Sequence, residues 1–145
     1  MRMPAAVPTP ESVLGHKPGD DFFLATYDEA ADYFKKLAAS SNRIKLVEAG
    51  KTTQGRDWYV AFISNPENLA QLDHYKEMSR RLALARGIDD ATARQMSHDI
   101  KPIIHIDGGM HATEVANAQH TIQLGYDLVA REEPADQTVA ADYYA

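Results

Sequence analysis

Two side chains in the segment 108–120, GGMHATEVANAQH, are of types that bind metal ions. His111 offers an imidazole nitrogen, and Glu114, three residues later, offers a carboxylate. Three residues are close to one helical turn, so both side chains project from the same side of a chain that turns here. Zn²⁺ accepts both kinds of ligand. The same pair also occurs without a metal on many helix surfaces, so the H-x-x-E spacing leaves a metal site and an ordinary surface pair open.

The residues around this pair predict a buried strand followed by a helix. The run PIIHID, residues 102–107, is apolar and ends in Asp-Gly-Gly, which indicates a central buried strand that stops in a loop. Ligands of open α/β sheets bind beyond the carboxyl ends of strands, which is where His111 and Glu114 fall. The following helix is predicted from about Glu114 to Arg131. Val115, Ala118, Ile122, Tyr126 and Val129 lie on one stripe of this helix.

Small residues surround the predicted metal-binding pair. Gly108 and Gly109 have no Cβ, so the backbone can approach a neighbour or a ligand closely there. Ala118, Thr121 and Gly125 follow Glu114 at helical spacing and form a track of small residues. This track is expected to let the helix pack tightly against the sheet.

The upstream sequence predicts alternating helices and strands. Residues 1–25 are rich in proline and predict an extended arm, and TYDE at 26–29 has the form of a helix capping box. The runs 43–50 and 57–64 predict two adjacent strands, of which the second is covered on both faces. Residues 66–98 predict a helical segment between strands. This order is that of an α/β fold.

Composition excludes several classes of function. The chain has 145 residues, of which 44% are hydrophobic, as in one soluble globular domain. A net charge of -6 without a basic cluster argues against nucleic acid as a partner. No apolar run is long enough to predict a membrane-spanning segment, and the first residues show no signal peptide. Because the chain has no cysteine, a metal must be held by His, Asp or Glu.

His105 and Asp107 each have two interpretations, and Trp58 has a structural one. His105 lies inside the predicted strand and is expected to pack in the core, the alternative being a metal ligand or a hydrogen-bond partner of one. Asp107 stands at the strand end, where it can either orient a ligand imidazole or cap the turn. Trp58, the single tryptophan, is predicted to be in the core.

Several stretches together resemble one known family. GGMHATEV after an apolar strand resembles the zinc-binding H-x-x-E element of the M14 metallocarboxypeptidases. Residues 26–64 are similar to the opening helix, first strand, G-x-[ST]-x-x-G-R turn and second strand of that family, with the turn at 50–56. ESVLGHKPGDDFFLATYDE and SNPENLAQLDHYKE resemble a large bacterial branch that carries a helical insertion before the zinc strand. The resemblance covers residues 8 to 133, approximately.

This resemblance implies a fold, a cofactor and a reaction. The fold is α/β, a mixed sheet with helices on both faces, with residues 26–145 as the N-terminal part of the domain and the helical insertion at about 66–98. The implied cofactor is Zn²⁺, with His111 and Glu114 as two of its three protein ligands. The implied reaction is hydrolysis of the C-terminal peptide bond of a peptide or protein, and the family is largely secreted or periplasmic.

The family residues that complete the site lie downstream of the zinc element. They include a second His ligand, an Arg that holds the substrate carboxylate and a Glu that activates the zinc-bound water. The residues after Glu114 contain no counterpart of this second His, so the chain is predicted to be an incomplete fragment without a catalytic residue, inactive on its own. The sequence leaves the preferred C-terminal residue and the oligomeric state undetermined.

Two other functions fit the same element. Zinc deacylases of small acylamino acids use a similar H-x-x-E, but they typically carry a glycine directly after the His, where this chain has Ala112. A non-catalytic domain that binds peptides or partners, with a vestigial zinc element, is the other alternative. Sequence beyond Ala145 discriminates these functions, because a further His and a late Glu would restore catalysis.

Overall fold

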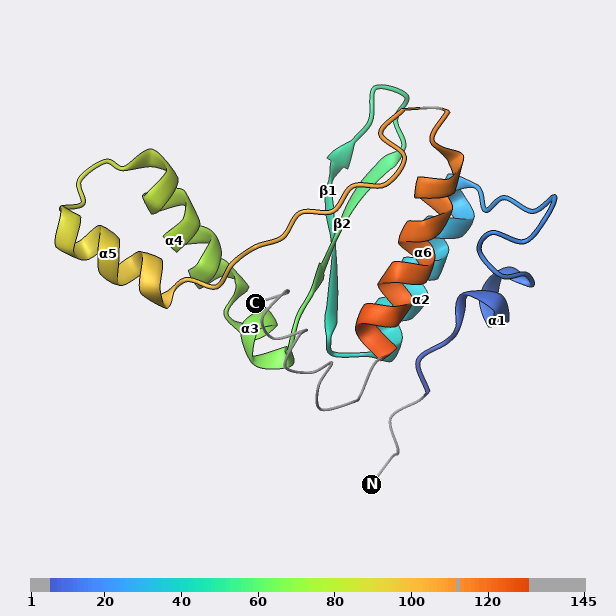
Figure 1. Cartoon of the computed structure of the whole chain (residues 1–145), viewed down its shortest axis with the longest axis horizontal. Coiled ribbons are helices and arrows are strands. Elements are labelled where there is room, and N and C mark those ends of the chain that lie inside the picture. The colour runs from blue at the N-terminus through green and yellow to red at the C-terminus, as the bar shows by residue number, and fades with distance from the viewer. Residues whose placement is uncertain (1–5, 112, 131–145) are drawn as a thin grey trace.

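The computed structural model of the chain describes residues 6–111 and 113–130. Figure 1 shows a long β-hairpin with two helices side by side along it, and a separate group of helices beyond one end of the hairpin. The elements are α1 (Pro10–Leu14), α2 (Tyr27–Ser40), β1 (Ile44–Lys51), β2 (Asp57–Ile63), α3 (Pro66–Ala70), α4 (Leu72–Leu84), α5 (Asp90–Asp99) and α6 (Val115–Ala130).

Helix α2 begins at the predicted capping box. The Thr26 backbone N–H donates to a Glu29 carboxylate oxygen over 2.8 Å, and the Glu29 N–H donates to the Thr26 hydroxyl oxygen. These bonds satisfy N–H groups that have no partner within the helix. The Thr26 backbone bond is also the main reason why the pKa of Glu29 is lowered. On the inward side of the helix, Tyr33 and Leu37 are completely buried.

The predicted strands form an antiparallel hairpin. Strands β1 and β2 pair with Ile44 opposite Ile63, and the register shifts between Glu48 and Gly50. Gly50 has a φ of 144°, a backbone conformation that favours glycine. The turn at 52–56 closes through a hydrogen bond from the Thr52 N–H to the Arg56 carbonyl oxygen. The local sequence therefore contains the determinants of both strands and of the turn that joins them.

The core lies between the hairpin and the helices α2 and α6. A cluster of five buried side chains joins α2, β1 and α6, and Figure 1 shows α2 and α6 packed together along the hairpin. Gly125 of α6 permits this packing, because a Cβ at this position would lie 2.7 Å from the Phe34 ring. The members of the cluster are Tyr33, Leu37, Ile44, Ile122 and Val129.

The N-terminal segment is held against these helices. The Tyr33 hydroxyl donates to the Pro8 carbonyl oxygen over 3.0 Å, and burial raises the pKa of Tyr33. Within the predicted extended arm, α1 forms one short helix because the Thr9 side chain accepts the Ser12 N–H. The division into an arm at 1–25 and a domain at 26–145 remains a prediction.

Residues 66–99 form three helices. The Asn65 side chain accepts the Asn68 N–H over 2.9 Å, so α3 begins at Pro66 as predicted. The predicted helical segment is divided between α3 and α4 at Gln71, whose φ and ψ are -105° and 15°. Helices α4 and α5 lie side by side beyond the end of the hairpin (Figure 1). No helix among the described residues is long and apolar enough to cross a membrane.

Two predictions about the sheet are wrong. Residues 102–107 form no strand and lie as an irregular, exposed segment, because a strand needs a neighbour and the two described strands hydrogen-bond only to each other. Strand β2 is not covered on both faces, since Trp58 is 58% exposed and Val60 points to the same open side. The predicted α/β class is confirmed, whereas the sheet of the described residues is two-stranded and antiparallel.

Candidate metal site

His111 and Glu114 lie in a turn that leads directly into α6. The Glu114 N–H donates to the His111 carbonyl oxygen over 3.0 Å, which closes the turn before the helix begins at Val115. Gly109 precedes this turn with a φ of 75°, in the left-handed region. The predicted helix from about Glu114 is thus confirmed to Ala130, and its last predicted residue lies outside the described part.

The two candidate ligands bond to each other. The His111 Nδ1 and Glu114 Oε1 atoms are 2.6 Å apart, and the His111 backbone N–H donates to the other carboxylate oxygen over 3.3 Å. The imidazole bond, followed by the backbone bond, lowers the pKa of Glu114. Glu114 is therefore ionised near neutral pH, and the imidazole donates to it. The predicted convergence of the two side chains is confirmed.

This donor pair fits half of a zinc site. A neutral imidazole nitrogen and an ionised carboxylate are ordinary zinc ligands, and both side chains are open to solvent. Metal binding by both atoms requires the hydrogen bond between them to open, because Nδ1 must lose the proton that it donates and Oε1 must turn its accepting lone pair to the metal. Within residues 6–111 and 113–130, no group of three His, Cys, Asp or Glu side chains is placed to hold a metal.

His105 and Asp107, the other two candidate residues, bond to each other. The prediction that His105 packs in the core is wrong, because its imidazole is exposed and pairs with Asp107, with 2.8 Å between Nε2 and Oδ1. Side chains two residues apart in an extended segment lie on the same side, which brings this pair together. The Asp107 carboxylate thus bonds the neighbouring His105 imidazole, and this is its bond within the part of the chain that the structure describes.

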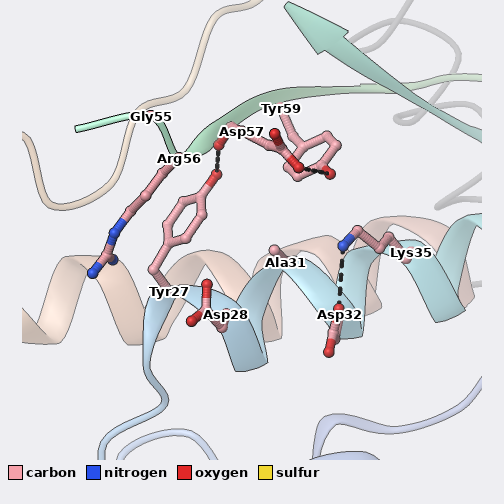
Figure 2. Close-up of a pocket in the computed structure, with 9 residues that line it drawn as sticks. All are labelled: Tyr27, Asp28, Ala31, Asp32, Lys35, Gly55, Arg56, Asp57 and Tyr59. Atoms are coloured by element: carbon pink, nitrogen blue, oxygen red, sulfur yellow. Dashed lines mark hydrogen bonds and ion pairs between the residues drawn. The ribbon is translucent and has the colours of Figure 1, made fainter. Parts of the chain in front are cut away.

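A polar pocket between α2 and the hairpin turn was not predicted. Its volume is about 390 Å³, and Figure 2 shows Tyr27, Asp57 and Tyr59 meeting over α2. The Tyr27 hydroxyl donates to the Asp57 carbonyl oxygen, and the Tyr59 hydroxyl donates to the Asp57 carboxylate over 3.0 Å. The Arg56 guanidinium lies 5.8 Å from the centre of the Tyr27 ring. These contacts attach α2 to the hairpin, in agreement with a structural role for the turn arginine.

Gln119 is a second feature that the sequence reasoning missed. Its side chain is 6% exposed and makes two hydrogen bonds to the backbone of Ala25, one to the N–H and one to the carbonyl oxygen. The segment before α2 is therefore fastened to the helix that follows the candidate ligands. The signal in the sequence was a glutamine on the otherwise apolar side of this helix, because an amide that becomes buried there requires hydrogen-bond partners.

The fold is that of an α/β protein, and the candidate metal ligands His111 and Glu114 are paired at the start of a helix. The sequence model of the zinc carboxypeptidase family, peptidase M14, matches residues 30–144, and the chain belongs to this family. The predicted family is thereby confirmed, and His111 and Glu114 lie within the matched range. Neither a curated protein nor a solved structure matches the chain.

Proposed function

We propose that this chain provides two of the zinc ligands of a metallocarboxypeptidase, His111 and Glu114. The observation that carries the proposal is the 2.6 Å separation of Nδ1 and Oε1 at the start of α6, in a chain of the zinc carboxypeptidase family. The reaction we propose is hydrolysis of the C-terminal bond of a peptide or protein. By analogy with the family, we place this reaction in the periplasm or outside the cell.

In this chemistry, the described residues are assigned the two zinc ligands and no other role. A bound Zn²⁺ with an open position lowers the pKa of its water and polarises the scissile carbonyl. His111 would offer a nitrogen lone pair and Glu114 an ionised carboxylate, held in place by the turn between them. The third ligand, the general base and the group that holds the substrate carboxylate are assigned to residues outside the described part.

Zinc binding tests the ligand assignment. Calorimetry and metal analysis of the purified chain are expected to give one zinc per chain, and His111→Ala is expected to weaken binding about 10-fold or more. His120→Ala is the matched control, since His120 is exposed on the same helix, and it is expected to bind zinc like the unchanged chain. Equal binding by the His111→Ala variant would show that zinc is held elsewhere, and no binding at micromolar zinc would count against a preformed pair.

The purified 145-residue chain is expected to show no carboxypeptidase activity. Two ligands leave the metal weakly held, since no third His, Cys, Asp or Glu side chain is placed to complete a metal site in the described residues. The general base of the family is assigned to residues outside the described part. The measurement is release of the last residue from a peptide with a free C-terminus, with and without zinc, and with an amidated peptide as the control. Zinc-dependent release would contradict this expectation. Release of an amino acid from its N-acyl derivative would instead favour the deacylase alternative.

A further inference from the structure

The loop that carries His111 lies unusually close to α6. A Cβ built on Gly108 would be 2.2 Å from Thr121 Cγ2 and 2.6 Å from the Asn117 carbonyl oxygen. A Cβ on Gly109 would be 3.0 Å from that of Ala118. Since carbon atoms pack best at about 3.5 to 4.0 Å, only glycine fits at position 108 without displacement of the loop.

The helix surface beneath this loop has little freedom to yield. The Thr121 hydroxyl donates to the Ala118 carbonyl oxygen over 2.7 Å, and this bond fixes the side chain with its methyl group towards Gly108. The second contact is with the Asn117 carbonyl oxygen, which belongs to the helix backbone. A side chain at position 108 would therefore move the loop rather than the helix.

The position of the loop determines where His111 lies relative to Glu114. Glu114 directly precedes α6 and its carbonyl oxygen accepts the Ala118 N–H, so it is tied to the helix. His111 follows the glycines and is carried by the loop. We propose that Gly108, seated on Asn117 and Thr121, is a positioning residue that sets the separation of the His111 and Glu114 side chains. This inference rests on the proposed zinc function.

Gly108→Ala tests the contact without straining the backbone. The φ of Gly108 is outside the left-handed region, whereas Gly109 with its φ of 75° would be strained by any side chain. The added methyl group is expected to displace the loop by about 1 Å, given ordinary van der Waals separations. The bond between His111 Nδ1 and Glu114 is then expected to be lost, and zinc affinity is expected to fall about 10-fold or more.

Ala118→Val tests the seating of the same loop from the helix side, at the neighbouring contact with Gly109. A β-branched side chain is stiff in a helix, so one of its methyl groups must point towards Gly109. Ala116→Val is the matched control, because it places the same residue in the same helix at an exposed position. The two variants lose the same helix propensity, so a difference between them reports on the loop contact.

Two readouts on the whole chain decide the proposal. The ¹⁵N chemical shifts of the His111 ring report its bond to Glu114 without zinc, and calorimetry with zinc alone reports affinity. Loss of the ring bond and of affinity in the Gly108→Ala and Ala118→Val variants, with both retained in Ala116→Val, is the expected result. Thermal unfolding of the two valine variants is expected to give the same midpoint, which excludes general destabilisation.

The remaining outcomes are also decisive. An unchanged ring bond and affinity within twofold in Gly108→Ala would overturn the proposal while leaving the ligand assignment intact. If the unchanged chain binds no zinc, the ligand assignment fails for this chain, and the ring shifts alone then decide the positioning role. If Gly108→Ala does not fold, the comparison of Ala118→Val with Ala116→Val decides it, because Ala118 lies on an exposed part of the helix.

Discussion

Replacing Leu37 with Ala is expected to lower the free energy of unfolding by about 2 to 5 kcal/mol. Leu37 is completely buried in the cluster that joins α2, β1 and α6. Its Cδ2 atom lies 3.8 Å from the position of a Cβ at Gly125, so it packs where α2 contacts α6. The substitution removes apolar contacts and leaves a cavity that the closely packed helices cannot fill.

Urea unfolding followed by circular dichroism measures this loss. Leu84→Ala is the control, because Leu84 is 48% exposed at the end of α4, and it is expected to change stability by no more than about 0.5 kcal/mol. The difference between the variants should appear in the midpoint, with similar slopes. Equal midpoints for the two variants would mean that the cluster does not stabilise the chain as its burial indicates.

The correctly predicted elements are those whose determinants are local. The capping box of α2 requires only Thr26 and Glu29, and the start of α3 requires only Asn65 and Pro66. The convergence of His111 and Glu114 likewise depends on three-residue spacing at the start of a helix. Each of these features is complete within one turn of chain, so the sequence contains the whole physical cause.

The wrong predictions concern features that depend on distant partners. The apolar run at 103–106 has the composition of a buried strand, yet Ile103, Ile104 and Ile106 are exposed because no described strand pairs with them. The same open face of the hairpin leaves Trp58 exposed. Burial requires a covering element as well as an apolar side chain, and local sequence does not specify that element.

The track of small residues was predicted in part. Ala118 and Thr121 lie beneath Gly108 and Gly109, in the loop that carries His111, whereas Gly125 faces Phe34 of α2. The sequence indicated close packing of this side of the helix against the sheet, whereas the neighbours found here are the loop at 108–109 and α2. It did not indicate that the track packs against two different neighbours, because the tertiary fold sets the direction from which each neighbour approaches.

Replacing Gln119 with Leu is expected to lower the free energy of unfolding by about 1 to 3 kcal/mol, although leucine has a similar size and is more apolar. The amide of Gln119 accepts the Ala25 N–H over 2.9 Å and donates to the Ala25 carbonyl oxygen over 3.0 Å. Leucine makes neither bond, so two half-buried backbone groups of Ala25 would lose their partners. We expect the segment before α2 to detach from α6 first, because this pair of bonds fastens it there.

Gln123→Leu on the same helix separates this effect from the loss of an amide in general. Gln123 donates to Asp127 within the helix over 2.9 Å, an interaction of about 0.2 to 0.5 kcal/mol. Hydrogen exchange of the Ala25 amide provides the specific readout, since its N–H is expected to lose protection in Gln119→Leu and to keep it in Gln123→Leu. If the Ala25 amide stayed protected in both variants, another contact would have to hold the N-terminal segment on α6. Loss of protection at Ala25 together with unchanged ring nitrogens at His111 would show that this attachment and the candidate metal pair are independent, because Glu114 is tied to α6 by its own backbone bond to Ala118.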